Sequence, residues 1–209
     1  PLTSNPMKII CIGRNYADHA REFGNDVPEK PIFFCKPDTS LVVRNRPFFY
    51  PDFSEDIHYE TEIVLKICRL GKNIDKKFAH RYYKELTVGI DFTARDLQKE
   101  CKKNGWPWEV AKGFEGSAPI GKFIHKDKFP DVHRMSFNLQ LNGDTVQSGN
   151  TSDLIFSFED LIAYISRFMT LKMGDLIFTG TPAGVGPVKI GDHLVASIDD
   201  RTLLDFRVK

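Results

Sequence analysis

The stretch at residues 58–67, His-Tyr-Glu-Thr-Glu-Ile-Val-Leu-Lys-Ile, constrains the fold of this chain more than any other. Its apolar and β-branched second half predicts a strand. Strand side chains alternate between faces, so Glu60, Glu62 and Val64 point the same way, toward a buried interior. Two like charges on a half-buried face repel and are costly to desolvate, and a bound cation would remove both costs. An acidic pair facing solvent on an edge strand is the alternative that this stretch leaves open.

The length and composition predict one soluble globular domain spanning residues 1–209. The formal net charge is +1 and no basic face or arm stands out, which argues against a nucleic-acid partner. No apolar run approaches the roughly 20 residues of a membrane span. The four cysteines include no Cys-x-x-Cys pair and are expected to be reduced thiols, with Cys11, Cys35 and Cys68 in apolar surroundings.

The N-terminal residues 1–6 precede Met7, which could be the natural start. We expect these six residues to be left from a vector or from a processed precursor. They lack the apolar stretch of a signal peptide and the arginine bias of a transit peptide. The expected location is therefore cytoplasmic, or the mitochondrial matrix if the source is eukaryotic and a leader has been removed.

The remaining patterns predict a β-rich chain with a few helices. Strands are expected at residues 8–13, 32–35 (both buried), 41–43 and 87–92, in a hairpin around Asn142-Gly143, and on either side of Asp199-Asp200. Helices are expected from the cap Asp75 to about Glu85, from the cap Thr93 with Asp96 as its partner, and from Ser157 onward. The last has an apolar stripe that is expected to be core: Phe158, Leu161, Ile162, Ile165, Phe168 and Met169.

A short helix that Asn15 could cap carries His19 and Glu22 three residues apart. At that spacing the two side chains share one face of the helix and can touch. A carboxylate beside an imidazole can form a general base. An exposed ion pair on a surface helix is the alternative, and these residues alone favour it.

Three further positions are candidates for a site. Asp91 ends a predicted strand beside a helix start, where functional carboxylates are common, although it could merely cap that helix. The glycine-rich loop after residue 178 is neither a P-loop nor a dinucleotide fingerprint. It could offer backbone N–H groups and the Thr181 hydroxyl to a carboxylate. Lys112 reads locally as an ordinary surface lysine.

Three carboxylates without a neighbouring His or Cys ligand would select a hard cation such as Mg²⁺ or Mn²⁺ over Zn²⁺. Three protein ligands leave about half of an octahedral shell open. A bidentate 2-oxo carboxylate could fill two of the open places. This chemistry does not by itself name a reaction.

Taken together, several segments resemble the fumarylacetoacetate hydrolase family, most closely its small single-domain acylpyruvase and oxaloacetate decarboxylase branch. The similarity covers nearly the whole chain, from about residue 9 to residue 208. The matching segments are Gly-Arg-Asn-Tyr-Ala-Asp-His at 13–19, Lys-Pro at 36–37, His-Tyr-Glu-Thr-Glu at 58–62, Asp-Phe-Thr-Ala-Arg-Asp at 91–96, Lys112, Pro-Ile at 119–120, and Thr-Gly-Thr-Pro at 179–182 with Gly-Val-Gly at 184–186.

The resemblance implies an α+β, β-rich fold of the mixed β-sandwich or β-roll type, and a homodimer. It implies Mg²⁺ or Mn²⁺ held by Glu60, Glu62 and Asp91. It also implies a lid with His19 and Glu22 as a catalytic dyad, and Lys112 as a catalytic residue that contacts substrate. Arg14, Gln98 and Thr181 match positions that line the substrate site.

The implied reaction is cleavage of the C3–C4 bond of small 2-oxo acids, by acylpyruvate hydrolysis or oxaloacetate decarboxylation, with the metal holding the pyruvate enolate. Keto-enol isomerisation or decarboxylation of 2-oxo acids in aromatic catabolism is the alternative within the family. Two rivals come from other classes. Metal-dependent phosphoester hydrolysis predicts phosphate-binding residues or a second metal, which the sequence does not clearly show. A module that only binds divalent ions would not need His19, Glu22 or Lys112.

Overall fold

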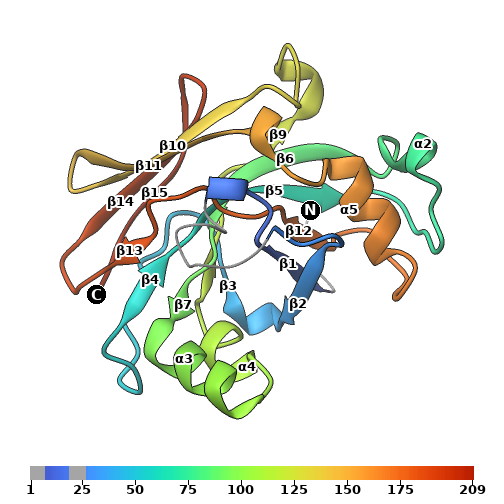
Figure 1. Cartoon of the computed structure of the whole chain (residues 1–209). Helices are drawn as coiled ribbons and strands as arrows, with labels where there is room; N and C mark the ends of the chain where they lie inside the picture. Colours follow the sequence, from blue (N-terminus) through green and yellow to red (C-terminus); the bar gives the residue numbers. More distant parts are fainter. Residues whose placement is uncertain (1–7, 19–26) are drawn as a thin grey trace.

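The largest sheet in the described part of the chain is a six-stranded mixed sheet. It contains residues 61–67 of the stretch that carries Glu60 and Glu62. Its strands are β1 (Ile9–Gly13), β2 (Ile32–Lys36), β5 (Thr61–Ile67), β6 (Tyr83–Ile90), β9 (Ile124–His125) and β12 (Leu176–Phe178). The computed structural model describes residues 8–18 and 27–209. The strand order is β2-β1-β12-β5-β6-β9, with β1 and β12 parallel and the other neighbours antiparallel (Figure 1).

A four-stranded antiparallel sheet packs against β5 and β6. It consists of β10 (Ser136–Leu141), β11 (Asp144–Asn150), β14 (His193–Ile198) and β15 (Arg201–Arg207), in the order β11-β10-β14-β15. Apolar side chains of both sheets, such as Ile63, Val88, Leu139 and Leu194, are fully buried in one core. The expected β-rich sandwich is thus confirmed.

Two small sheets and several short helices complete the described chain. The small sheets are β13 (Gly186–Pro187), β4 (Ile57–Tyr59) and β7 (Thr93–Ala94) in one, and β3 (Leu41–Val42) with β8 (Ala118–Pro119) in the other. The α-helices that lie entirely within the described residues are α2 (Lys76–Ala79), α3 (Arg95–Asn104), α4 (Glu109–Lys112) and α5 (Phe158–Ile165). The 3₁₀ turns are η1 (Asp38–Ser40), η2 (Lys126–Lys128) and η3 (Thr151–Asp153). Figure 1 shows α3 and α4 together at one end of the molecule, and α5 beside α2 at another.

The stretch expected to form one strand at residues 58–67 is two strands that meet at Glu60. β4 pairs with β7 and β13 in a small sheet, whereas β5 pairs with β6 and β12 in the large one. The chain therefore changes sheets at Glu60. This switch places Glu60 and Glu62 at a junction between sheets rather than on an edge strand.

The predicted hairpin and the predicted start of α5 are confirmed. Asn142 and Gly143 both have positive φ values, 54° and 95°, as a tight turn between β10 and β11 requires. At α5, the Ser157 side chain accepts a hydrogen bond from the Asp160 N–H, and the Asp160 carboxylate accepts one from the Ser157 N–H. These reciprocal bonds satisfy N–H groups that the helix leaves unpaired.

Two helix predictions are wrong in extent. Asp75 caps α2 as expected, but the helix ends at Ala79 because the chain then turns into β6 at Tyr83. Thr93 does not start a helix: it belongs to β7, and α3 begins at Arg95. The side chains of Thr93 and Asp96 bond to other parts of the chain, and these distant contacts override the local capping pattern.

The predicted burial is wrong at the edge of the large sheet. β2 is an edge strand, so Ile32 and Cys35 are exposed rather than buried. Phe168 is 57% exposed because α5 ends before it and its side chain leaves the core stripe. All four cysteines are free thiols, as expected.

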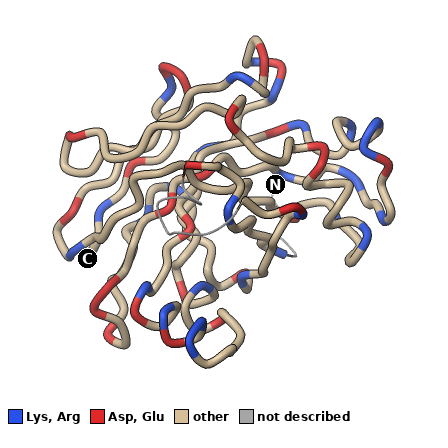
Figure 2. The backbone as a smooth tube through the Cα atoms, in the orientation of Figure 1, with Lys and Arg blue, Asp and Glu red and all other residues tan. Residues whose placement is uncertain are grey.

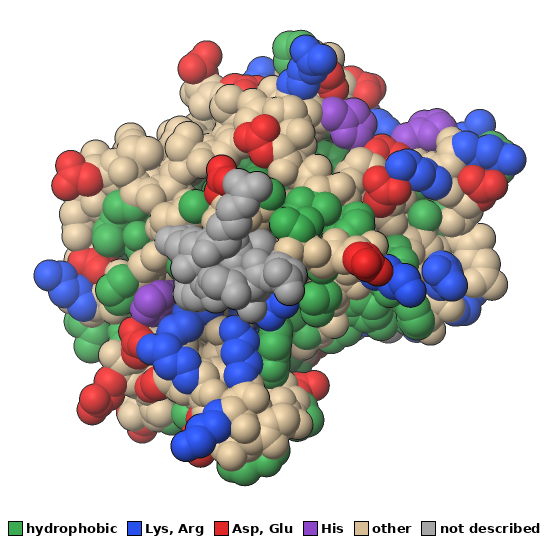
Figure 3. Space-filling view, viewed as in Figure 1, with side chains coloured by type: hydrophobic (Ala, Val, Ile, Leu, Met, Phe, Trp, Pro, Cys, Tyr) green, Lys and Arg blue, Asp and Glu red, His purple; other side chains and the backbone are tan. Residues whose placement is uncertain are grey.

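Lysine, arginine and acidic residues are interspersed along the chain and over the visible surface (Figures 2 and 3). Within residues 8–18 and 27–209, no helix has the length and apolar character needed to cross a membrane.

Replacing Ser157 by alanine should lower the free energy of unfolding by about 1 kcal/mol, because the hydroxyl that accepts from the Asp160 N–H and donates to the Asp160 carboxylate is lost. Urea unfolding followed by circular dichroism measures this loss. Ser148→Ala is the matched control, since Ser148 is exposed on β11. Equal stability of the two variants would contradict the assigned role of the cap.

Candidate active site

Three carboxylates converge where β5 and β6 lie side by side. The register pairs Thr61 with Ile90, and the Asp91 N–H donates to the Glu60 carbonyl oxygen at 2.8 Å. Asp91, immediately after β6, therefore lies beside Glu60, and Glu62 follows on the same face. One carboxylate oxygen from each residue lies within 4.8 Å of the other two, and all three residues are buried.

This donor set fits a hard divalent cation. Glu62 is 1% exposed, and burial together with the charges of Asp91 and Glu60 raises its pKa well above its usual range. The Oδ1 atom of Asp91 is buried without a hydrogen bond, although Lys36 Nζ approaches it to 2.7 Å outside hydrogen-bond geometry. A divalent cation would stabilise all three ionised carboxylates and occupy an unused lone pair.

Lys112 lies at the side of this cluster. α4 carries it to 2.8 Å from Asp91 Oδ2 and 3.0 Å from Glu60 Oε2, and only 2% of the residue is exposed. Burial alone would lower the pKa of Lys112, but the charges of Asp91 and Glu60 raise it above its usual value. Lys112 is therefore a protonated, buried cation in the site. Its local sequence had indicated an ordinary surface lysine instead.

Glu60 is oriented by two donors from the β7–α3 segment. Thr93 Oγ1 donates to Glu60 Oε1 at 2.9 Å, and an Arg95 guanidinium nitrogen donates to the same oxygen at 2.7 Å. Arg95 also donates to Gln98 Oε1 at 2.7 Å. Because each of these side chains is buried, the orientation of Glu60 is tightly determined.

Asp91 has a second buried lysine on its far side. Lys36, at the end of β2, donates to the carbonyl oxygens of Phe92 and Ser117 at 3.1 and 2.9 Å, and to Ser117 Oγ at 3.0 Å. With the close contact to Asp91, these bonds use the donors of the ammonium group. Lys36 thus fixes the position of the carboxylate.

The loop after β12 closes the site near Glu62. The Gly180 N–H donates to Glu62 Oε2 at 2.7 Å. Gly180 has φ 105°, and a Cβ there would lie 2.6 Å from Asn15 Cβ, so only glycine fits. The Asn15 side chain bonds to the carbonyl oxygens of Thr179 and Phe156 and to the Phe156 N–H, which ties β1 to this loop. The helix that Asn15 was expected to cap continues into residues outside the described part, so that capping role stays a prediction.

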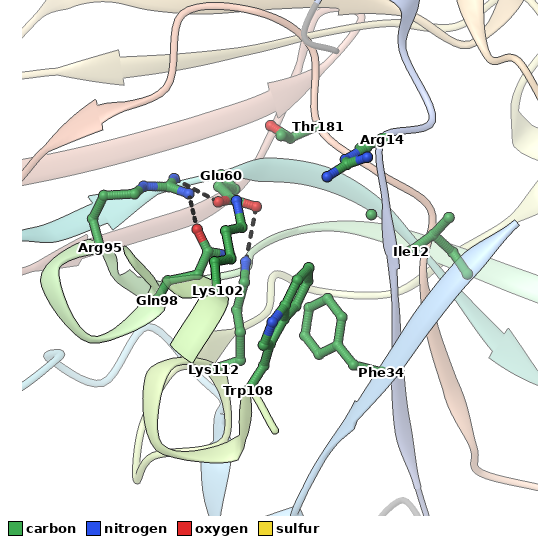
Figure 4. Close-up of a pocket in the computed structure, with 11 residues that line it drawn as sticks. Ile12, Arg14, Phe34, Glu60, Arg95, Gln98, Lys102, Trp108, Lys112 and Thr181 are labelled. Atoms are coloured by element: carbon green, nitrogen blue, oxygen red, sulfur yellow. Dashed lines mark hydrogen bonds and ion pairs between the residues drawn. The ribbon is translucent and has the colours of Figure 1, made fainter. Parts of the chain in front are cut away.

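A small pocket opens onto this cluster (Figure 4). Its volume is about 50 Å³, room for roughly four ordered waters, which suits a small acid. Figure 4 shows Arg14 entering from β1, with Gln98 and Lys112 opposite it. The complete lining is Ile12, Gly13, Arg14, Phe34, Glu60, Arg95, Gln98, Lys102, Trp108, Lys112 and Thr181.

The structure thus brings together seven of the nine predicted site residues: Arg14, Glu60, Glu62, Asp91, Gln98, Lys112 and Thr181. His19 and Glu22 lie outside the described residues. The Thr181 hydroxyl accepts a hydrogen bond from Gln147 Nε2 at 2.9 Å, and the residue remains in the pocket wall.

Sequence reasoning assigned no role in the site to Lys36, Thr93 or Arg95; Thr93 was expected only to cap a helix. Lys36 stood in a matching Lys-Pro pair, and Arg95 stood four residues after Asp91 in a matching segment. Their place in segments that match the family was the only indication that they belong to the site. Local spacing could not show which carboxylate each side chain would contact.

This fold and site define a class of metal-dependent enzyme, in which a β-sandwich buries three carboxylates beside a lysine at the end of a small polar pocket. Within that class, the chain belongs to the Fumarylacetoacetate (FAA) hydrolase C-terminal family, which matches residues 8–209.

Three relatives agree over most of the chain. The mitochondrial oxaloacetate tautomerase FAHD1 of Mus musculus is 42% identical over 201 residues, covering 96% of this chain and 91% of the relative. The mitochondrial oxaloacetate decarboxylase of Dictyostelium discoideum is 44% identical over 192 residues, covering 91% and 88%. The crystal structure of fumarylpyruvate hydrolase from Pseudomonas aeruginosa in complex with Mn²⁺ and pyruvate superimposes with a TM-score of 0.92 at 38% identity, covering 97% and 89%.

Replacing Thr93 by valine should lower the affinity for Mn²⁺ by roughly 10-fold or more, because Glu60 loses a donor that orients it while the charge of the site stays the same. Calorimetric titration of the folded variant with Mn²⁺ measures this change. Thr87→Val is the control, since Thr87 is equally buried on β6 and, within the described residues, its hydroxyl bonds only to the neighbouring Val88 carbonyl. Equal affinity in both variants would show that the orientation of Glu60 does not govern binding.

Proposed function

We propose that this chain is a divalent-metal enzyme that cleaves the C3–C4 bond of small 2-oxo acids, by acylpyruvate hydrolysis, oxaloacetate decarboxylation or both. The observation that carries the proposal is the convergence of three buried carboxylates with protonated Lys112 beside them. The relatives named as an oxaloacetate decarboxylase and a fumarylpyruvate hydrolase support the same chemistry.

Keto-enol isomerisation of a 2-oxo acid is a second candidate at the same site. It is favoured by the relative named as an oxaloacetate tautomerase. Isomerisation and C–C cleavage both pass through an enolate of the 2-oxo acid, so both need positive charge near the C2 oxygen.

The metal is Mg²⁺ or Mn²⁺ in this proposal, with Glu60, Glu62 and Asp91 as its ligands. Carboxylate oxygens are the ligands these hard cations prefer, and a solved relative contains Mn²⁺. When bound, the cation supplies Lewis acidity at the C2 oxygen of the substrate.

Lys112 supplies a second positive charge to the developing pyruvate enolate. Its ammonium is buried, so its field is little screened by water. Arg14, Gln98 and Thr181 line the pocket and would bind the substrate. These residues serve both reactions, since both leave the electron pair of the broken C3–C4 bond in the enolate.

His19 and Glu22 act only in the hydrolytic reaction. Glu22 orients the imidazole, His19 takes a proton from water, and the resulting hydroxide attacks the C4 carbonyl of an acylpyruvate. Oxaloacetate releases carbon dioxide without water attack. This assignment rests on the resemblance of residues 13–19 to the family.

We further propose that the chain is a single catalytic domain that forms a homodimer. Its proposed location is the cytoplasm, or the mitochondrial matrix if the source is eukaryotic; two relatives are named as mitochondrial. Gel filtration with light scattering tests the dimer directly.

Removal of metal with EDTA should abolish turnover of oxaloacetate and acylpyruvates, and Mg²⁺ or Mn²⁺ should restore it. Without a cation the three carboxylates repel, so the melting temperature should also fall on EDTA treatment and recover with metal. Coupled assay of pyruvate and differential scanning fluorimetry provide the two measurements. Full turnover in metal-free protein would refute the metal requirement.

The His19→Ala variant should lose about 10²–10⁴-fold in acylpyruvate hydrolysis, the typical cost of removing a general base, and much less in oxaloacetate decarboxylation. Lys112→Ala should impair both reactions, because both form the same enolate. Acetylpyruvate, fumarylpyruvate and oxaloacetate are compared on the same preparations, with metal content checked. The division of roles fails if His19→Ala lowers both reactions equally while Lys112→Ala spares either one.

A further inference from the structure

The pocket contains a cation that the proposed chemistry leaves unused. Arg95 and Lys112 are paired with Glu60 or Asp91. Lys102 also lines the pocket, yet it forms no ion pair with any carboxylate in residues 8–18 and 27–209. Its ammonium is therefore available to an anion that enters the pocket.

The helix α3 directs Lys102 toward the pocket. Arg95, Gln98 and Lys102 are spaced by three and four residues, so they share one face of α3, and all three line the cavity. Figure 4 shows Lys102 rising from α3 toward the space that Arg14 enters from the opposite side. The neighbouring Lys103 lies on a different face and is not part of the lining.

The ring of Trp108 holds the ammonium of Lys102 in this direction. Its Nζ lies 5.6 Å from the centroid of the Trp108 ring, and Trp108 packs against Phe34 with a centroid distance of 5.8 Å. Phe34 in turn lies 5.1 Å from Lys112 Nζ. The aromatic pair thus places two lysines along one wall of the pocket, Lys112 beside the carboxylates and Lys102 farther along α3.

The backbone of Arg14 indicates that its position is also enforced. Its φ is 60°, in the left-handed region that residues other than glycine rarely adopt. Such backbone strain persists where surrounding structure imposes it, and it often accompanies a ligand site. Lys102 is exposed overall, but its partial desolvation lowers its pKa, and the nearby charges of Arg95 and Arg14 lower it further, as expected where positive charges gather.

We propose that Lys102 is a specificity-determining residue, whose ammonium, with Arg14 facing it, binds the distal carboxylate of a dicarboxylic 2-oxo acid. This inference rests on the proposed function, in which the three-carboxylate end of the pocket takes the 2-oxo acid group. The second carboxylate of oxaloacetate or fumarylpyruvate then extends along the wall to Lys102. Acetylpyruvate ends in a methyl group and cannot use this cation.

The same contact influences what happens to oxaloacetate. In decarboxylation the C3–C4 bond breaks, its electron pair enters the enolate, and the C4 carboxylate leaves as neutral carbon dioxide. Negative charge therefore departs from Lys102 in the transition state, so Lys102 stabilises the bound substrate more than the transition state. Keto-enol proton transfer keeps the C4 charge and carries no such penalty. Lys102 thus increases binding and favours tautomerisation over loss of carbon dioxide.

The test compares Lys102→Met with Lys102→Arg and with Lys103→Met. Methionine keeps an unbranched side chain of similar length without the charge, and Lys103→Met removes the same charge from the adjacent position, which is also exposed but outside the pocket. For Lys102→Met, the KM for oxaloacetate should rise roughly 10- to 100-fold, the range expected for a lost charge-assisted hydrogen bond. The kcat for carbon dioxide release should not fall, and acetylpyruvate kinetics should stay within about 2-fold of the wild type. Lys102→Arg should recover most of the affinity, and Lys103→Met should resemble the wild type.

A binding measurement separates this inference from the proposed reaction. N-oxalylglycine and oxamate are both unreactive monoamides of oxalic acid, in which the amide carbonyl stands in for the 2-oxo group, and only the first has a distal carboxylate. Calorimetric titration of Mg²⁺-loaded protein should show tighter binding of N-oxalylglycine in the wild type, and this preference should disappear in Lys102→Met. If the wild type turns over no 2-oxo acid but keeps the Lys102-dependent preference, the proposed reaction fails and the carboxylate subsite stands. Equal effects of Lys102→Met on oxaloacetate and acetylpyruvate, or an equal effect of Lys103→Met, would overturn the subsite.

Discussion

Three buried carboxylates share the junction of β4, β5 and β6 with three buried cations, and the geometry of the site depends on this balance of charge. The carboxylates are Glu60, Glu62 and Asp91, and the cations are Lys36, Arg95 and Lys112. An unpaired charge in such an interior would cost several kcal/mol. Among the described residues, Glu62 alone of the three acids has no ion pair, and its only hydrogen bond comes from the Gly180 N–H. Glu62 is therefore the carboxylate whose negative charge is least compensated. A divalent cation would stabilise this carboxylate most.

The backbone holds these charges in place through contacts between distant segments. The change of sheet at Glu60 turns two glutamates of one stretch toward Asp91 on the neighbouring strand. Asn15 and Gly180 then join β1 to the loop after β12, so the wall beside Glu62 packs without space for a larger side chain. Arg14 follows directly from β1 in this arrangement. The three-carboxylate end of the pocket and the wall that contains Arg14 are consequently built from the same framework.

The pocket is polarised along its length. One end combines carboxylates with Lys112, whereas the α3 wall presents Lys102 beside Trp108. A small acid with two negative groups matches this arrangement better than an acid with one. The relatives named for oxaloacetate and fumarylpyruvate chemistry are consistent with a site of this kind. A single pocket can therefore support cleavage or isomerisation, since both reactions form an enolate beside the same positive charges.

The sequence by itself determined the features that follow from backbone periodicity and local hydrogen bonding. Alternation along a strand predicted the shared direction of Glu60 and Glu62, Asn142-Gly143 predicted a hairpin, and Ser157 predicted a capped helix. The resemblance to a family added Lys112, which nothing in its own neighbourhood distinguished from a surface lysine.

Tertiary structure alone decided that Thr93 would donate to Glu60 instead of capping a helix, that β2 would be an exposed edge, and that Lys36 would contact Asp91. Each of these outcomes joins residues 30 or more positions apart or depends on which strand neighbours another. The physical reason is that burial and pairing of a polar group are properties of the assembled sheets, and no local window of sequence contains them.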